Sequence, residues 1–237
     1  MDKSNKITFV QEKLALDWKC NCNVFKEEEN IFIKSENHFF DMITFGKNAV
    51  IKVDPSIYNW CVELFSITPA QDIMDGDNLF AIEMKLREFG KKLAGEHTRY
   101  LYLNKNKTIC RPSSFQYKFF DKTNINTLYG KKGFDFDNAL NYQNDVIAFG
   151  AYKEDQLVAL AGADDGMEGL WQIGIDTLPE YRNRGPACYL VKNLADEIER
   201  QGVLPYYTTW SPNIASTTVA LKSGFSPVWV QYYSVDI

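Results

Sequence analysis

The 237-residue sequence lacks any run of about 18 apolar residues, the length that a membrane-spanning helix requires. It also lacks an excess of basic charge, because 26 Lys and Arg stand against 31 Asp and Glu, a net charge of −5. Nucleic-acid binding needs clustered Lys and Arg, so this balance argues against a nucleic-acid footprint. The start, MDKSNKITFV, has no apolar segment before a small-residue cleavage site. We therefore expect a cytoplasmic protein with no membrane partner.

Metal-binding residues are scarce. The five cysteines are odd in number and scattered, which indicates reduced and mostly buried thiols. Cys20 and Cys22 lie close together, but neither His38 nor His97 stands at ligand spacing from them. We expect no metal site.

Two common phosphate-binding loops are missing as well. No Gly-Lys-Ser or Gly-Lys-Thr occurs, which excludes the nucleotide-triphosphatase loop. No Gly-x-Gly-x-x-Gly occurs either, which excludes the dinucleotide fingerprint. A site for a phosphate-bearing ligand must therefore be built differently.

What the sequence has is enough apolar material for a real core, with 45% hydrophobic and 14% aromatic residues. The length allows one large domain or two modest ones. The polar stretch 104–114 is the candidate boundary. We predict an N-terminal α/β domain over residues 1–110 and a second domain over residues 113–237.

The hydrophobic pattern predicts a mixed α/β fold. Expected strands cover residues 48–54, 99–103, 146–152, 157–163, 170–177, 203–210 and 225–235, and expected helices cover 56–65, 78–89, 121–128, 186–201 and 213–222. Ser56 is the expected N-cap of the first helix. Turns at 153–156 and at Asp164-Asp165-Gly166 predict that three of the strands form an antiparallel meander.

The segment EYRNRGPACYLVKNLADEIERQG, residues 180–202, combines two arginines with a helix start. The apolar stripe of the helix is expected to comprise Ala187, Leu190, Val191, Leu194, Ala195 and Ile198, whereas Lys192, Asn193, Asp196, Glu197, Glu199 and Arg200 are expected to face outward. Pro186 suits the first turn and Gly202 the end. The loop is either a charged turn before a surface helix or a cradle for a pyrophosphate. In a cradle, unpaired backbone N–H groups and the forked donors of Arg182 and Arg184 would hold the phosphates.

The order of elements around this loop resembles the GNAT superfamily of acyl-CoA-dependent N-acyltransferases. Its signature Arg/Gln-x-x-Gly-x-Gly/Ala matches Arg182, Gly185 and Ala187, after a lead-in, TLPEYR, with Thr177 in the usual apolar place. The second signature matches Asn213, Ser216, Gly224 and Phe225. The resemblance covers residues 113–237, and within the superfamily the chain is most similar to a bacterial subgroup with an additional N-terminal domain.

The resemblance implies a mixed, mostly antiparallel central sheet flanked by helices, preceded by a smaller α/β domain. It implies acetyl-CoA as co-substrate, held where the fourth and fifth strands of the domain splay apart. The residues that it places at the cofactor are Ile175, Thr177, Arg182, Asn183, Arg184, Gly185, Pro186, Ala187, Asn213 and Ser216. For Asn213 and Ser216, an N-cap and an early-helix hydroxyl are the alternative interpretation.

The implied reaction is transfer of an acetyl or short acyl group to a primary amine by direct attack on the thioester. Many members carry a Tyr acid four residues before the closing Gly, where this chain has Ala220. Tyr207 and Ser211, with Tyr206, are the candidate substitutes, although strand tyrosines are commonly packing residues. Asp176 and Glu168, on or beside the fourth strand, are the candidate bases, with a solvated carboxylate as the alternative for each.

The acceptor is expected to be a small-molecule or peptide amine, and the sequence leaves a homodimer open. A second hypothesis, motivated by Ala220, is a catalytically silent CoA-binding regulatory protein. A third treats the N-terminal half as an interaction domain that brings a protein amine to the site.

Overall fold

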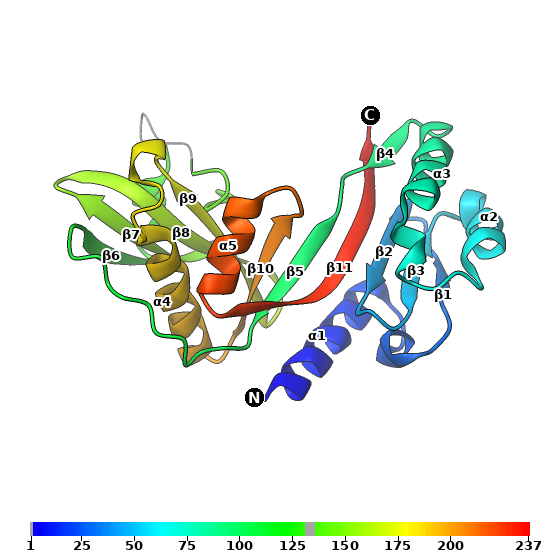
Figure 1. Cartoon of the computed structure of the whole chain (residues 1–237), viewed down its shortest axis with the longest axis horizontal. Helices are drawn as coiled ribbons and strands as arrows, with labels where there is room; N and C mark the ends of the chain where they lie inside the picture. Colours follow the sequence, from blue (N-terminus) through cyan, green and yellow to red (C-terminus); the bar gives the residue numbers. More distant parts are fainter. Residues whose placement is uncertain (1, 131–135) are drawn as a thin grey trace. The chain divides into compact units, whose positions relative to one another are not determined.

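The structure is a computed structural model, and it describes residues 2–130 and 136–237 (Figure 1). The chain forms two compact units. The first comprises the residues up to Arg99 together with Val228–Ile237, and the second comprises Tyr100–Pro227. Strands β5 (His97–Tyr102) and β11 (Phe225–Asp236) contribute residues to both. The domain ranges 1–110 and 113–237 stay a prediction.

The first unit combines helices with a small mixed sheet. Its elements are α1 (Lys3–Trp18), η1 (Cys22–Lys26), β1 (Ile31–Lys34), β2 (Phe40–Thr44), β3 (Ala49–Val53), α2 (Pro55–Phe65), η2 (Asp72–Met74), α3 (Gly76–Arg87) and β4 (Lys91–Leu93). The strand order is β1-β3-β2-β11, and β4 also pairs with β11. Only β1 and β3 run parallel among the pairs within this unit, and the other pairs are antiparallel.

The start of α2 differs from the prediction. Asp54, and not Ser56, is the N-cap, because its Oδ1 accepts the Ser56 N–H at 2.9 Å. Pro55 then occupies the first helical position, where its missing N–H costs nothing. The helix buries Ile57, Cys61 and Phe65.

The second unit is built on a larger sheet. Its elements are the end of β5, β6 (Gln116–Asp121), η3 (Ile125–Leu128), β7 (Asp145–Lys153), β8 (Gln156–Met167), β9 (Leu170–Thr177), η4 (Pro179–Tyr181), α4 (Pro186–Arg200), β10 (Leu204–Trp210), α5 (Ile214–Lys222) and the start of β11. The strand order is β5-β10-β9-β8-β7-β6. Strands β6 to β9 are antiparallel and β10 joins β9 in parallel. The predicted meander and the mixed, mostly antiparallel sheet flanked by helices are thus confirmed.

Two local predictions in this unit were wrong. Residues 121–128 are not a helix, because the Asp121 carboxylate accepts the Thr123 N–H at 2.9 Å and turns the chain after β6. Only Ile125–Leu128 are helical, as one short 3₁₀ turn. The Asp164-Asp165-Gly166 segment is not the hairpin turn, because β8 continues through an irregularity to Met167. The turn lies at Glu168-Gly169, where Gly169 has a φ of 79°.

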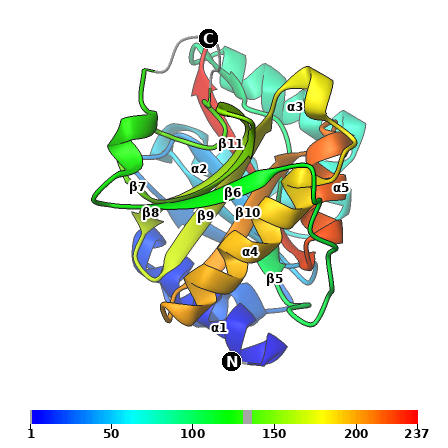
Figure 2. The same cartoon turned by 90° about the vertical axis from the view of Figure 1, so that its left-hand side faces the viewer.

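Helix α4 covers one face of this sheet, as Figure 2 shows, and contacts β7, β8 and β9. Its buried side chains include Leu190, Val191 and Leu194, as the sequence predicts. Lys192 was predicted to face outward but is 8% exposed. Its ammonium lies 5.4 Å from the Tyr102 ring centroid and bonds Asp196 at 2.6 Å, so the stem is buried while the charge is neutralised at the surface.

In the part of the chain that the structure describes, no helix has the length and apolar character needed to cross a bilayer. The same residues contain no group of three or more His, Cys, Asp and Glu side chains arranged to hold a metal ion.

Candidate active site

Strands β9 and β10 separate at one end of the second unit. Their parallel register runs from Leu170 opposite Leu204 to Ile173 opposite Tyr207. Both strands continue beyond that point, β9 to Thr177 and β10 to Trp210, while β9 stays paired with β8 as far as Thr177. The sheet therefore opens between β9 and β10 just after Ile173 and Tyr207.

The backbone of β9 presents hydrogen-bonding groups toward this opening. Gly169 accepts the Leu204 N–H at 3.1 Å on the β10 side, and Leu178 donates to Val158 at 2.9 Å on the β8 side. Because successive strand residues alternate in direction, the backbone groups of Ile175 and Thr177 point toward β10. Ile175 and Thr177 are two of the residues predicted to lie at the cofactor, and their backbone groups thus point toward the opening.

Helix α4 begins at the end of the loop that follows β9. Gly185 is its N-cap, with a φ of 87°, and no side chain caps the helix. Pro186 has no N–H, and the first backbone bond runs from Tyr189 N to Gly185 O at 3.4 Å. The N–H groups of Ala187 and Cys188 lie before that bond and have no carbonyl within the helix to receive them. The start of α4 therefore offers amide donors and the positive end of the helix dipole.

The loop residues are exposed around this helix start. The segment Arg182–Gly185 is solvent-exposed, and Asn183 adopts a φ of 60°. Arg182 Nε donates to the Thr177 carbonyl at 3.2 Å, and the Arg184 guanidinium lies 5.4 Å from the Tyr181 ring centroid. Both arginines are thus held at the loop by single contacts, and their remaining N–H groups can serve an anion.

Burial also leaves one polar atom next to the opening unsatisfied. Within the described residues, Thr177 Oγ1 is buried and has no hydrogen-bond partner. A buried hydroxyl normally finds a partner, so this atom marks a position where a ligand group can bond. The exposed loop, the uncapped helix and this hydroxyl together fit a ligand that carries phosphates and amides.

The two residues of the second signature have structural partners. Asn213 is the N-cap of α5, because its Oδ1 accepts the Ser216 N–H at 3.0 Å. The Ser216 hydroxyl lies 2.9 Å from the Tyr207 hydroxyl. Burial raises the pKa of Tyr207 to about 12, so the phenol stays protonated at neutral pH and can act as a hydrogen-bond donor. The N-cap interpretation of Asn213 is therefore present in the structure, and its role at the cofactor stays a prediction.

Asp176, the candidate base, is engaged by a neighbouring segment. Its Oδ2 accepts the N–H groups of Asn138 and Ala139 at 3.0 and 2.9 Å, and its Oδ1 accepts Asn138 Nδ2 at 2.7 Å. The same segment lies directly on two registered glycines of β8 and β9. A Cβ at Gly162 would stand 1.9 Å from the Ala139 carbonyl oxygen, and a Cβ at Gly174 would stand 1.5 Å from that of Asn138. Asp176 therefore holds residues 138 and 139 against the sheet. Their backbone can lie this close because Gly162 and Gly174 have no side chains.

The remaining acid candidates differ in their surroundings. Tyr206 donates to Gln172 at 2.8 Å, and Ser211 follows β10 and is half-buried. Ala220 is completely buried, so the usual position of the tyrosine acid is part of the core.

Sequence reasoning missed a second polar contact between β10 and α5. Thr209 is 3% exposed, and its hydroxyl lies 3.3 Å from the Tyr100 hydroxyl and 3.2 Å from the Thr217 hydroxyl. The alternation of Tyr207 and Thr209 along a strand was the available signal.

Comparison with known proteins assigns the family. The GNAT acetyltransferase family model matches residues 84–233, and the chain belongs to this family. No curated protein matches the sequence.

Several solved structures resemble the chain at low identity. A GCN5-related N-acetyltransferase-like protein from Streptococcus suis is 17% identical with a TM-score of 0.48, over 68% of this chain and 69% of that one. A GNAT-family acetyltransferase from Colwellia psychrerythraea is 14% identical with a TM-score of 0.43, over 61% and 57%. A GCN5-related N-acetyltransferase from Kribbella flavida is 15% identical with a TM-score of 0.47, over 64% and 62%. The chain thus spans 57% to 69% of the length of these three proteins.

Proposed function

We propose that this protein is an N-acetyltransferase that moves an acetyl or short acyl group from acetyl-CoA to a primary amine by direct attack on the thioester. The observation that carries the proposal is the opening between β9 and β10 beside the uncapped, exposed start of α4. Family membership gives the general class of acyl transfer. The acetyl group, the amine and the roles of individual residues are part of the proposal.

The pyrophosphate of the co-substrate would bind the start of α4. The N–H groups of Ala187 and Cys188 and the side chains of Arg182 and Arg184 supply the donors. Gly185 allows the ligand to approach the backbone, because it carries no side chain and its φ of 87° suits glycine alone. Asn183 and Pro186 complete the turn that aims these groups outward.

The pantetheine arm would bond the backbone of β9. Ile175 and Thr177 direct their N–H and C=O groups toward β10, and Thr177 Oγ1 adds a buried hydroxyl. An N–H donor at Ile175 would stabilise negative charge that develops on the thioester oxygen during amine attack. This interaction lowers the barrier only if the donor is fixed in advance, which the pairing of β9 with β8 provides.

Hydrogen-bond donors near the end of the β9–β10 pairing would assist the departing thiolate. Tyr207 stands at the last registered position and bonds Ser216. A phenol with a raised pKa is a poor proton source but a good hydrogen-bond donor to a departing thiolate. Ser211 is a second candidate for the hydrogen-bond donor to the thiolate. Asp176 is assigned to fastening residues 138 and 139, because its carboxylate accepts three hydrogen bonds from them.

The test measures CoA binding and acetyl transfer separately. Calorimetry with CoA is expected to show one saturable site, weakened at least about tenfold by Arg182→Ala with Arg184→Ala, since bonds to charged groups contribute about 1.5–3 kcal/mol. Arg200→Ala is the matched control, because Arg200 lies at the far end of the same helix and pairs with Glu197. Release of free CoA with a panel of amines, followed by a thiol-reactive dye, measures transfer. Absence of CoA binding by the wild-type protein would refute the proposal.

One observation favours a second function, a CoA-binding regulatory protein without catalysis. Ala220 occupies the usual acid position and is completely buried. This alternative predicts the same CoA binding and the same effect of the arginine substitutions. It also predicts no release of CoA with any amine of the panel, and turnover with one amine would exclude it.

A further inference from the structure

A notch opens in the first unit where β11 changes partners. Strands β2 and β11 pair from Thr44 opposite Val230 to Asp41 opposite Tyr233. Beyond this point Ser234–Asp236 pair with β4 instead. The Phe40 N–H bonds the Ser234 hydroxyl at 3.2 Å. The two strands diverge here around a cavity of about 370 Å³.

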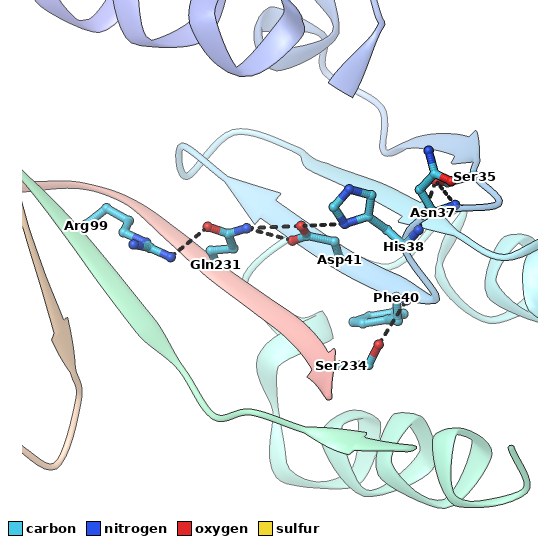
Figure 3. A network of polar contacts seen from close by, with 8 residues as sticks. All are labelled: Ser35, Asn37, His38, Phe40, Asp41, Arg99, Gln231 and Ser234. Carbon is cyan, nitrogen blue, oxygen red and sulfur yellow. Dashed lines mark hydrogen bonds and ion pairs between the residues drawn. The ribbon is translucent and has the colours of Figure 1, made fainter. Parts of the chain in front are cut away.

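A buried carboxyl group forms part of the wall of this cavity. Asp41 is 5% exposed, and Gln231 Nε2 donates to its two oxygens at 2.9 and 3.1 Å. Arg99 in turn donates to Gln231 Oε1 at 3.1 Å, as the chain of contacts in Figure 3 shows. Gln231 is thus oriented with its amide nitrogen toward Asp41. One neutral amide group serves both oxygens, which leaves further acceptor capacity on the carboxylate.

The charge of this carboxyl group is poorly compensated. Burial raises the pKa of Asp41 to about 7, against smaller opposing effects of Gln231, Arg99 and Lys52. His38 Nδ1 lies 3.9 Å from Asp41 Oδ2, but burial lowers the pKa of His38, so the imidazole is neutral at pH 7. The charged groups that act on Asp41 are Asp17 of α1, Lys52 of β3 and Arg99 of β5. His38 lies beside it, and the titratable residues Lys91 of β4 and Tyr233 and Asp236 of β11 line the same cavity.

The cations around the notch are already engaged. Lys52, in register with Asp41, is 7% exposed, and its ammonium lies 5.6 Å from the Trp18 ring centroid. Lys91 Nζ bonds Asp236 Oδ1 at 2.5 Å and lies 5.6 Å from the Phe39 ring centroid. These two opposite charges neutralise each other at the same wall that holds Asp41. The buried carboxylate is therefore the group in the notch that gains most from a positively charged ligand.

We propose that this notch binds a small organic ammonium ion, whose charge pairs with Asp41. An anion is disfavoured by the carboxylate in the wall. Ca²⁺ and Mg²⁺ are disfavoured because they take six or more oxygen ligands, whereas Phe39, Phe40 and Val235 also line the cavity. Zn²⁺ is disfavoured because the described residues contain no group of three or more His, Cys, Asp and Glu side chains arranged to hold a metal ion. An ammonium group needs one carboxylate, and its alkyl part suits the apolar lining. The proposal concerns binding alone and is independent of the acyl-transfer site.

The experiment is calorimetric titration of the full-length protein, without any acyl-CoA, with butylamine and 1,4-diaminobutane. The neutral control ligand is 1-butanol, and Nα-acetyl-lysine methylamide stands for a protein lysine. Asp41→Asn keeps the shape and removes the charge. Glu88→Gln is the matched control variant, because Glu88 is an exposed carboxylate outside the notch that is paired with Lys85.

The expected result is saturable binding of an amine at pH 8, with affinity at least about tenfold weaker in Asp41→Asn and unchanged in Glu88→Gln. At pH 6.5 binding to the wild-type protein should release protons, measured in two buffers of different ionisation heat, because the ligand favours the ionised carboxyl. This second measurement needs no variant. No binding, equal binding of 1-butanol, an unchanged affinity in Asp41→Asn, or tighter binding of the lysine amide or of Ca²⁺ would each overturn the proposal.

Discussion

Replacement of Asp176 separates a structural role from a catalytic one. Asp176→Ala removes three hydrogen bonds, two of them from the backbone N–H groups of Asn138 and Ala139. Asp176→Asn keeps one oxygen that can accept both backbone bonds. Its amide nitrogen then faces Asn138 Nδ2, and a rotated Asn138 side chain can present its oxygen to that nitrogen instead.

The magnitude follows from these contacts. Hydrogen bonds to a charged acceptor contribute about 1.5–3 kcal/mol each, and partial exposure allows water to replace some of them. We expect Asp176→Ala to lower the free energy of unfolding by about 2–4 kcal/mol. Asp176→Asn loses only the contribution of the charge and should cost about 1 kcal/mol.

The assay combines urea unfolding with the pH profile of kcat/KM for an amine acceptor. If Asp176 only fastens the 138–139 segment, kcat in Asp176→Asn stays within about tenfold of the wild-type value and the pH profile keeps its shape. Loss of a general base would cost about 100- to 10,000-fold and remove the acidic limb of the profile. That loss, with stability unchanged, would refute the structural assignment.

Three further predictions concern other positions. Gly185→Ala should weaken CoA binding and lower stability by about 1–2 kcal/mol, measured by calorimetry and urea unfolding, because a residue with a φ of 87° strains any side chain. Tyr207→Phe should lower kcat without raising the KM for acetyl-CoA, measured by dye-coupled kinetics, and an unchanged kcat would remove Tyr207 from the mechanism. Asp41 has a folded pKa of about 7, above its ordinary value of 3.8, so its contribution to stability falls as pH rises from about 4 to about 7. Asp41→Asn should flatten this slope in urea unfolding, and a parallel slope in both proteins would contradict the raised pKa.

Much of the second unit could be predicted from the sequence because its signals are local. The apolar stripe of α4 repeats at helical spacing, and Pro186 and Gly202 mark its ends. The antiparallel meander followed from alternating apolar residues, although its second turn was placed at Asp164–Gly166. In the structure the strand continues through Gly166 with an irregularity in its register. The sequence signal was ambiguous because an Asp-Gly pair fits both a hairpin turn and an irregularity within a strand.

Other features depend on residues far apart in the sequence and gave no local signal. Helix α1 buries Lys6 and Gln11 beside Val10 and Leu14, so its pattern is blurred by buried polar residues. The environment of Asp41 depends on Gln231, which is 190 positions away. The local sequence around Asp41 alternates polar and apolar residues over a short stretch, and this pattern does not indicate that the carboxylate is buried.

The proposed acyl transfer needs a general base more than a general acid. A departing thiol has an ordinary pKa of about 8.5, so the thiolate leaves without full protonation, and a hydrogen bond from Tyr207 is sufficient help. A primary ammonium has a pKa near 10 and cannot attack until it loses a proton. The absence of a tyrosine acid at position 220, where buried Ala220 stands, should therefore slow the reaction little, because the reaction needs an acid less than it needs a base. Asp176 is bonded to Asn138 and Ala139, so under the proposed function we expect solvent to take the proton from the amine. The rate at neutral pH should then be limited by the small fraction of neutral amine.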